Sequence, residues 1–191
     1  MQPFRNHYYL LRHGHSLANE THVISSVLQD DHYPLTEDGI QTVTRSIQQS
    51  PLTHDTIIFC SPFRRTMQTA AIAQTLLGCR PSQSIPLLGE RGFGKLNGCS
   101  TRLYPAIWVL DKANIDLSYY GVESAAAVSS RMMQVIRQSE QCHEDQTILV
   151  VSHGDPLQIL VATITGLSPN LHRQIPSFHP GELTLLAPKC D

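Results

Sequence analysis

The chain has 191 residues, of which 41% are hydrophobic and 16% are charged. These values are typical of one folded domain with a buried core and exclude a disordered chain. With 14 lysines and arginines against 16 aspartates and glutamates, the formal net charge is −2, so no bulk charge favours nucleic acid or an anionic membrane as a partner. We expect a single domain over residues 1–191, with any anion site confined to a local cluster of basic side chains.

Cysteine usage and the first residues favour a cytoplasmic location. The five cysteines have no paired spacing, which argues against both a disulfide framework and a structural zinc site. Residues 1–7 lack the apolar stretch of a secretory signal. The longest apolar runs, such as residues 148–151, are too short to cross a bilayer, so we expect no membrane partner.

The first part of the chain alternates between strand and helix patterns. A continuous apolar run at residues 8–11 predicts a strand buried on both faces. Thr36 can cap the helix that follows. The apolar face of that helix would consist of Ile40, Val43 and Ile47. A second apolar run, at residues 56–60, predicts the next strand.

The middle of the chain continues this alternation and then interrupts it. A helix is predicted over residues 63–77 and would end at Gly78. A third strand is predicted at residues 85–88. Residues 91–122 do not continue the pattern and are expected to form a short insertion over the active-site rim, at one edge of the sheet. The pattern resumes with a helix over residues 124–138.

The last part of the chain adds two strands and one helix. Strands are predicted at residues 147–152 and 183–187, and a helix follows Pro156, a residue well suited to a first helical turn. Strands that alternate with helices predict an α/β fold, in which a mostly parallel sheet is covered by helices on both faces.

Polar and reactive residues follow four of the predicted strands. In open α/β sheets, ligands bind beyond the carboxyl ends of the strands, so we expect these side chains to meet at one rim. In chain order, they are Arg12, His13, His15 and Ser16; Arg64 and Arg65; Glu90 and Arg91; and His153, Gly154 and Asp155.

These residue types suit phosphoryl transfer without a metal. A neutral imidazole is a good nucleophile toward phosphorus, and arginines present permanently charged, forked donors to phosphate oxygens. A glutamate can give a proton to the departing alkoxide, and a second, protonated histidine can share the charge on the equatorial oxygens. Gly14 and Gly154 would let the backbone approach the ligand closely.

Six sequence blocks resemble the histidine phosphatase superfamily, in particular its phosphoglycerate-mutase-like branch. They occur in the order of the family and extend over most of the chain. The blocks are residues 10–19 (LLRHGHSLAN), 34–39 (PLTEDG), 61–70 (SPFRRTMQTA), 90–94 (ERGFG) with Gly98, 121–124 (GVES) and 151–154 (VSHG). One short block would carry little weight, whereas six in order are specific.

The resemblance implies a catalytic role for five residues. His13 would be the nucleophile that is phosphorylated. Arg12, Arg65 and His153 would surround the phosphoryl group. Glu90 would be the proton donor.

The resemblance also implies roles around these five. Ser16, Asn19 and Gly154 would help to bind phosphate or substrate. Arg64 stands at a position where the family tolerates many residues, so we expect it to face solvent. His15, also at a variable position, is expected to shape the rim rather than to catalyse.

A metal site is the main alternative for a chain with ten histidines. Such sites bring several neutral ligands onto one ion, often from a motif such as H-E-x-x-H. The strand-end histidines have arginines beside or near them, which repel a cation, and the other histidines show no ligand spacing. We therefore expect no metal and no cofactor.

The same chemistry serves hydrolases and mutases. A mutase must exclude water while its intermediate reorients, which requires a closing segment. The chain ends at Asp191, soon after the last predicted strand, and the 91–122 insertion is short for a mutase. We therefore expect a metal-independent phosphomonoester phosphatase that acts through a phosphohistidine on His13. The alternatives are a phosphoglycerate-type mutase and a non-catalytic module that binds phospholigands.

A small-molecule phosphate is the expected substrate. The insertion contains three basic and four aromatic residues, which are Lys95, Arg102 and Lys112 with Tyr104, Trp108, Tyr119 and Tyr120. It could cover an anionic substrate with an aromatic or apolar portion, or the aromatic side chains could simply pack the insertion onto the sheet. The family that the chain resembles also includes phosphatases that act on phosphohistidine proteins. Those enzymes have little insertion, so the insertion in this chain favours a small-molecule substrate.

Overall fold

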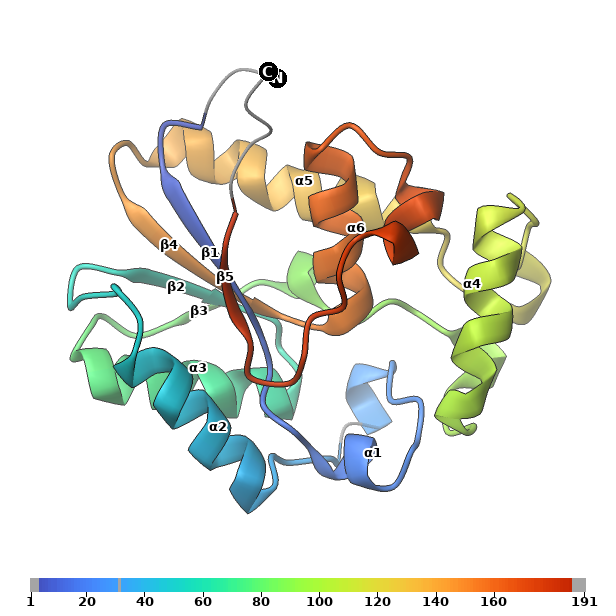
Figure 1. Cartoon of the computed structure of the whole chain (residues 1–191), viewed down its shortest axis with the longest axis horizontal. Helices are drawn as coiled ribbons and strands as arrows, with labels where there is room; N and C mark the ends of the chain where they lie inside the picture. The colour runs from blue at the N-terminus through green and yellow to red at the C-terminus, as the bar shows by residue number, and fades with distance from the viewer. Residues whose placement is uncertain (1–3, 31, 187–191) are drawn as a thin grey trace.

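The computed structural model describes residues 4–30 and 32–186 (Figure 1). A five-stranded sheet with the order β3-β2-β4-β1-β5 forms its centre. The strands are β1 (His7–Arg12), β2 (Ile57–Cys60), β3 (Gln83–Ser84), β4 (Thr147–Ser152) and β5 (Leu183–Leu185). β5 is antiparallel to β1, and all other neighbours are parallel. The predicted α/β fold with a mostly parallel sheet is confirmed.

The central strand explains the continuous apolar runs in the sequence. β4 pairs with β1 on one side and with β2 on the other. Its Leu149 and Val151 belong to the apolar cluster on one face of the sheet, whereas Ile148 and Val150 belong to the cluster on the other face. Both faces of β4 are therefore buried, which requires apolar residues at successive positions.

Helices cover both faces of the sheet (Figure 1). α2 (Glu37–Gln48) and α3 (Arg64–Leu77) lie on one face, and α5 (Ala125–Cys142) and α6 (Gly154–Ile164) lie on the other. The short α1 (Leu17–Glu20) and the 3-10 turns η1 (Leu28–Asp30) and η6 (Pro169–Gln174) lie in connecting segments. Within residues 4–30 and 32–186, no helix is both long and apolar enough to cross a bilayer.

The predicted start of α2 and the predicted end of α3 are confirmed. The Thr36 side chain accepts a hydrogen bond from the main chain of α2, and Gly78, with a φ of 67°, ends α3 in the left-handed conformation. Val43 and Ile47 face the core from α2 as predicted. Ile40, in the first turn of α2, does not, because 36% of its surface stays exposed.

The third predicted strand is wrong in position. β3 lies at Gln83–Ser84, and the predicted residues form mainly a 3-10 turn, η2 (Pro86–Leu88). Pro86 has no N–H to donate to a neighbouring strand, so the ladder ends before it. The Ile85 main-chain N–H still donates to the Cys60 carbonyl oxygen at 2.8 Å, which fixes this segment beside β2. At the last strand, residue 187 of the predicted range lies outside the described residues.

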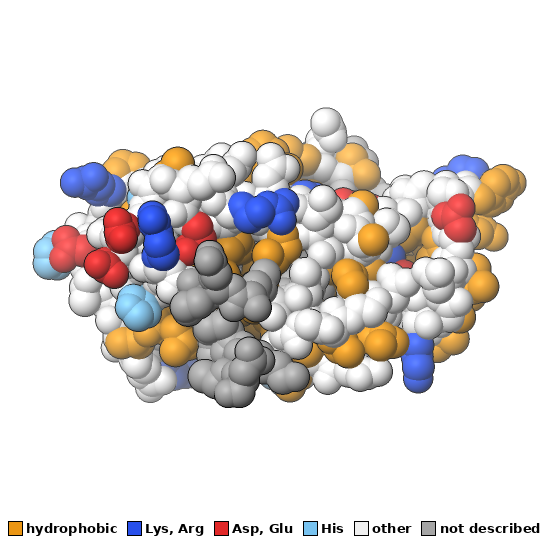
Figure 2. All heavy atoms as spheres, turned by 90° about the horizontal axis from the view of Figure 1, so that it is seen from above, with side chains coloured by type: hydrophobic (Ala, Val, Ile, Leu, Met, Phe, Trp, Pro, Cys, Tyr) orange, Lys and Arg blue, Asp and Glu red, His pale blue; other side chains and the backbone are white. Residues whose placement is uncertain are grey.

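The insertion lies beyond the carboxyl ends of the strands (Figure 1). It contains α4 (Tyr104–Lys112) and the 3-10 turns η3 (Gly94–Leu96), η4 (Thr101–Leu103) and η5 (Ser118–Tyr120). A small apolar cluster fixes the insertion to the segment that follows α1; it consists of Ile24 of that segment with Phe93, Ile107 and Val122. Figure 2 shows hydrophobic side chains on the surface at this end of the molecule, where the exposed ones are Leu103, Val109, Ile115, Tyr119 and Tyr120.

Two glycines let α2 approach the loop that follows β1. A Cβ atom on Gly39 would lie 2.1 Å from the His15 carbonyl oxygen, and one on Gly14 would lie 2.6 Å from the Gly39 carbonyl oxygen. Both distances are far inside van der Waals contact. Gly14 is therefore required by helix packing, and its approach to a ligand stays a prediction.

We predict that Gly39→Ala destabilises the protein although alanine favours helices. The added methyl group must push the His15 backbone away, and such overpacking typically lowers the free energy of unfolding by about 1–3 kcal/mol. Urea unfolding measures this change. Gly92→Ala is the control, because its Cβ would lie at an ordinary 3.6 Å from the nearest atom. Equal stability of wild type and Gly39→Ala would contradict the close-packing explanation.

Candidate active site

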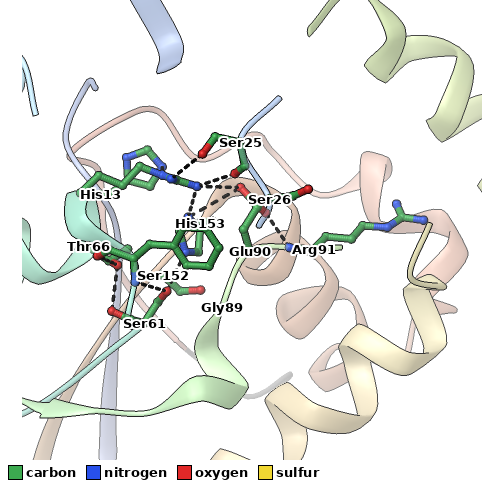
Figure 3. Close-up of polar contacts among 12 residues, drawn as sticks. His13, Ser25, Ser26, Ser61, Thr66, Gly89, Glu90, Arg91, Ser152 and His153 are labelled. Atoms are coloured by element: carbon green, nitrogen blue, oxygen red, sulfur yellow. Dashed lines mark hydrogen bonds and ion pairs between the residues drawn. The ribbon is translucent and has the colours of Figure 1, made fainter. Parts of the chain in front are cut away.

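Catalytic candidates from four segments meet at the carboxyl edge of the sheet (Figure 3). His13 follows β1, Arg65 lies in the first turn of α3 after β2, and His153 follows β4. Glu90 follows η2. Together with Arg12 at the end of β1, these five residues are called the strand-end cluster. The structure thus brings together all five residues to which the sequence assigned catalytic roles.

His13 presents a neutral ring nitrogen to the cluster. Its side chain is buried, with 3% exposed. Arg65 Nε lies 3.1 Å from His13 Nε2, and since an arginine N–H can only donate, Nε2 accepts. The ring proton is then on Nδ1, which donates to the Gly14 carbonyl oxygen at 2.8 Å. Burial, followed by the charges of Arg65 and Arg12, holds the pKa of His13 well below its usual value, so the imidazole stays neutral.

Arg65 connects the two histidines. Its guanidinium is almost fully buried and lies 3.1 Å from both His13 Nε2, through Nε, and His153 Nδ1, through Nη2. Nη2 also donates to the Ser25 carbonyl oxygen at 3.0 Å, and Nη1 to the Ser25 hydroxyl at 3.3 Å. These contacts fix a permanent positive charge directly beside His13 Nε2.

His153 is neutral in the substrate-free protein. Because Arg65 donates to its Nδ1, its proton lies on Nε2 and is given to the Ser61 hydroxyl at 2.8 Å. Burial, and next the charge of Arg65, lower the pKa of His153 well below its usual value. The protonated state that the sequence predicts concerns the transition state, so it stays a prediction. A bound dianion would have to supply the negative charge that raises this pKa.

Glu90 faces the cluster and not the solvent. Its Oε2 lies 3.8 Å from Arg65 Nη2 and 3.6 Å from His153 Nδ1, and its Oε1 accepts the Arg91 main-chain N–H at 2.9 Å. Burial raises the pKa of Glu90 to about 7, although Arg65 opposes the rise. A carboxyl group with this pKa can both give and take a proton at neutral pH.

The Glu90 loop is held by α5. Arg131 of this helix donates from Nη1 to the carbonyl oxygens of Leu87 and Gly89, at 2.6 and 2.9 Å, and from Nη2 to that of Glu90, at 3.2 Å. Arg131 also pairs with Glu123 at 2.8 Å. The position of the Glu90 carboxyl group therefore depends on a residue more than forty positions later in the chain.

The Arg12 guanidinium has a buried N–H group that could donate to a ligand. Its Nη1 donates to the Phe178 carbonyl oxygen at 2.6 Å, whereas its Nε is buried and has no partner among the described residues. Gly154 lies against this guanidinium, since a Cβ on Gly154 would be 3.5 Å from Arg12 Cζ. A buried N–H without a partner is costly, and an anion beside it would remove that cost.

The structure places the remaining predicted residues outside this hydrogen-bond network. The Ser16 hydroxyl donates to Asn19 Oδ1 at 2.9 Å, within the capping arrangement of α1. Among the described residues, neither side chain bonds to the strand-end cluster, so their role in phosphate binding stays a prediction. His15 Nδ1 lies 3.1 Å from the Thr36 hydroxyl, and Arg64 is exposed as predicted.

A cluster of this composition suits phosphoryl transfer, and comparison with known proteins agrees. The family model of the histidine phosphatase superfamily (branch 1) matches residues 8–190. The chain belongs to this superfamily. It is 32% identical over 179 residues to the probable phosphoglycerate mutase GpmB of Erwinia tasmaniensis, covering 87% of this chain and 78% of that protein.

Two further comparisons involve phosphatases. Identity to phosphoserine phosphatase 1 of Hydrogenobacter thermophilus is 27% over 164 residues, covering 83% of this chain and 75% of that protein. The solved structure of the alpha-ribazole phosphatase from Shigella flexneri has a TM-score of 0.75 and 26% identity, covering 93% of this chain and 88% of that one. This member of the histidine phosphatase superfamily is thus an enzyme of the phosphatase or mutase type.

A cavity of about 170 Å³ adjoins the strand-end cluster. We call it the rim cavity; it is lined by Arg12, Glu90, Phe93, Tyr104, Trp108, Gly154, Asp155, Gln158, Arg173, Ser177 and Phe178. Its volume is close to the roughly 150 Å³ of a protein cavity that binds benzene, so it has room for a group of about one ring. Tyr104 and Trp108 line this cavity, and Tyr104 also packs against the apolar cluster of the insertion, so both sequence interpretations stay open for these side chains.

The basic residues of the insertion do not line the rim cavity. The cations at its wall are Arg12 and Arg173, and Arg173 comes from η6. Arg173 Cζ lies 3.7 Å above the Trp108 ring, and its guanidinium bonds to Gln158. The Lys95 ammonium lies instead 4.5 Å above the exposed Tyr119 ring. Among the described residues, no three His, Cys, Asp or Glu side chains are grouped to hold a metal ion.

Sequence reasoning missed several residues that position the strand-end cluster. Ser61 begins a block already noted at the end of β2, so its place at a strand end could have identified it. Ser25, Arg131 and Arg173 lie in segments without any local signal. Their contacts arise only when distant parts of the chain come together.

We predict that Ser61→Ala lowers kcat/KM on a phosphomonoester by about 2–10-fold, the usual value of one hydrogen bond. Without the hydroxyl, the Nε2–H of His153 loses its acceptor and the ring loses its orientation. Steady-state kinetics measures the effect. Ser139→Ala is the control, because this buried hydroxyl bonds to the Val135 carbonyl oxygen within α5. A loss of equal size in both variants would show that Ser61 does not act through His153.

Proposed function

We propose that this protein is a metal-independent phosphomonoester phosphatase that forms a phosphohistidine on His13. The observation that carries the proposal is the contact between Arg65 and His13 Nε2: a buried, neutral nucleophile lies 3.1 Å from a buried guanidinium. Such a pair suits an incoming phosphoryl dianion, since the cation binds its oxygens while the nitrogen attacks its phosphorus.

The first step transfers the phosphoryl group to the enzyme. Substrate oxygens replace His13 as acceptors of the Arg65 N–H groups, and the Nε2 lone pair of His13 attacks phosphorus. The P–N bond forms as the bond from phosphorus to the ester oxygen breaks. The departing alkoxide takes the proton of the Glu90 carboxyl group and leaves as an alcohol.

The second step releases inorganic phosphate. Water attacks the phosphorus of phosphohistidine, and the Glu90 carboxylate takes its proton. The P–N bond breaks and returns its electron pair to His13 Nε2. Arg12, Arg65 and His153 surround the phosphoryl oxygens in both steps, so charge that develops in either transition state meets fixed donors.

Two observations support hydrolysis over mutase activity. The rim cavity, of about 170 Å³, is partly open to solvent, whereas a mutase must exclude water while its intermediate reorients. In addition, Lys95, Arg102 and Lys112 do not line the cavity. Among the described residues that line the cavity, Arg173 is then the one cation besides Arg12 that a second phosphoryl group could meet. We propose a compact small-molecule phosphomonoester as the substrate, with no nucleic acid or membrane as partner.

We predict that the protein releases phosphate from small phosphomonoesters in the presence of EDTA and that His13→Ala abolishes this release. Loss of the nucleophile removes the intermediate and should lower kcat by at least about 10³-fold. Phosphate release over a metabolite panel measures the activity. His54→Ala is the control, because this side chain is exposed and lies outside the cluster.

The same assay separates the alternatives. Isomerisation that needs a bisphosphate primer, with little free phosphate, would establish a mutase. Binding of phosphate esters without turnover would indicate a non-catalytic module. Brief reaction with labelled substrate followed by denaturation should leave phosphate on His13 that is stable to base and labile to acid.

We predict a bell-shaped pH profile of kcat/KM on an alkyl phosphate. His13 must be neutral to attack, and its lowered pKa places the acid limb below pH 6.5. Glu90 must carry a proton, and its pKa of about 7 places the basic limb near pH 7. Glu90→Gln should lower kcat/KM by about 10²–10⁴-fold and remove the basic limb.

Nitrophenyl phosphate provides the control for the acid role. Its leaving group departs without a proton, so Glu90→Gln should change its kcat/KM little and its profile should lack the basic limb. Equal losses on nitrophenyl and alkyl phosphates would exclude Glu90 as the proton donor.

A further inference from the structure

Asp155 has no role in either of the two proposed reaction steps. It lies in the first turn of α6, two residues after His153, and only 9% of its side chain surface is exposed. It lines the rim cavity together with Glu90. Two carboxyl groups at one small cavity, beside an anion site, need a physical explanation because like charges repel.

One oxygen of Asp155 joins two elements. Trp108 of α4 donates its indole N–H to Asp155 Oδ2 at 3.2 Å, and Arg91 Nη1 lies 3.6 Å from the same oxygen. Asp155 is thus the point at which the insertion is tied to the start of α6, next to the strand-end cluster. The ring of Trp108, held in this way, forms part of the cavity wall.

Arg91 does not neutralise Asp155 fully. Its guanidinium already binds Asp111 through two hydrogen bonds of 2.7 and 2.8 Å, and its Nε donates to the Glu123 carbonyl oxygen at 2.7 Å. In Figure 3 its guanidinium points away from His13 and His153. The Arg91 guanidinium therefore lies between two carboxylates and makes its shorter contacts with Asp111, so it only partly balances the charge of Asp155.

Arg91 also brings Glu90 and Asp155 together. Its main-chain N–H binds Glu90 Oε1, while its side chain reaches Asp155. After burial, the charge of Asp155 is a further cause that raises the pKa of Glu90, against the cations Arg65 and Arg12. Removal of Asp155 alone would leave Arg91 bound to Asp111, so the fold should tolerate it.

We propose that Asp155 is a positioning residue of this enzyme: it anchors Trp108 at the rim cavity and, by its negative charge, keeps the Glu90 carboxyl group in the protonated form that donates. The proposal rests on the proposed function, in which Glu90 is the acid. The other groups that act on Glu90 are Arg12 of β1, Arg65 of α3, Tyr104 of α4 and His153 before α6. Those that act on Asp155 are Arg12, Arg91, Tyr104, His172 and Arg173.

Asp155→Asn tests the charge at constant shape, because an asparagine oxygen can still accept the Trp108 N–H. For kcat/KM on an alkyl phosphate, the basic limb should move to lower pH by roughly 0.5–2 units, the range that Coulomb's law gives for charges several ångströms apart. The limb should be absent with nitrophenyl phosphate in wild type and variant alike. Asp116→Asn, which neutralises an exposed carboxylate on the insertion, should leave the limb in place.

Trp108→Phe distinguishes the charge from a structural role. This variant keeps the Asp155 charge but removes the donor that partly neutralises it, so the basic limb should stay in place or move to higher pH. Movement in the same direction in Trp108→Phe and Asp155→Asn would overturn the proposal, and so would an unchanged limb in Asp155→Asn. Asp155→Ser removes the same charge if the asparagine variant does not fold.

A second measurement does not depend on turnover. Carbon-13 NMR of protein labelled at the glutamate carboxyl carbon follows the titration of Glu90, whose signal is identified by its loss in Glu90→Gln. The titration midpoint should be lower in Asp155→Asn than in wild type, and equal midpoints would overturn the proposal. Failure of the proposed function would show instead as a wild type that does not hydrolyse nitrophenyl phosphate.

Discussion

A buried guanidinium between two neutral imidazoles determines the chemistry of this site. Arg65 lies 3.1 Å from a ring nitrogen of both His13 and His153, in a place that water barely reaches. A cation in such surroundings makes protonation of both rings unfavourable, so the lone pair of His13 stays available. In the proposed mechanism, the charge that binds the phosphoryl oxygens thus adds to burial in keeping His13 neutral and able to attack. The two tasks cannot be separated by mutation of Arg65.

The sheet fixes the catalytic residues through its own hydrogen bonds. The His13 main-chain N–H donates to the Ser152 carbonyl oxygen, and that of Ser61 donates to the Val151 carbonyl oxygen, both at 3.0 Å. The parallel ladder thus extends one residue past β1 and β2, into the site. Because β4 lies between these two strands, His153 emerges at the centre of the cluster. The positions of His13, Ser61 and His153 are therefore set by backbone pairing.

The sequence predicted those parts of the site that depend on local pattern. Apolar runs placed β1, β2 and β4, and the polar residues after them located His13, Arg65 and His153. The third strand was misplaced because residues 85–88 are apolar like a strand, but Pro86 has no N–H to pair with a neighbouring strand. The neutral state of the His153 ring in the substrate-free protein could not be predicted, because it depends on burial and on the charge of Arg65 from another segment. Contacts of Arg131 and Arg173 are non-local and leave no pattern in the sequence.

Glu90 and Arg91 divide their tasks although they are neighbours in sequence. The Glu90 side chain joins the strand-end cluster, whereas the Arg91 side chain is buried in the insertion against Asp111. Any displacement of α4 that carries Asp111 along must therefore pull on Arg91, whose main chain holds Glu90. Breaking a buried ion pair by removal of one partner costs about 3–5 kcal/mol, so this connection is stiff. Substitutions of Tyr104 or Trp108 would consequently change the wall of the rim cavity, whereas Glu90 is held by two separate connections, the Arg91–Asp111 pair and the hydrogen bonds from Arg131.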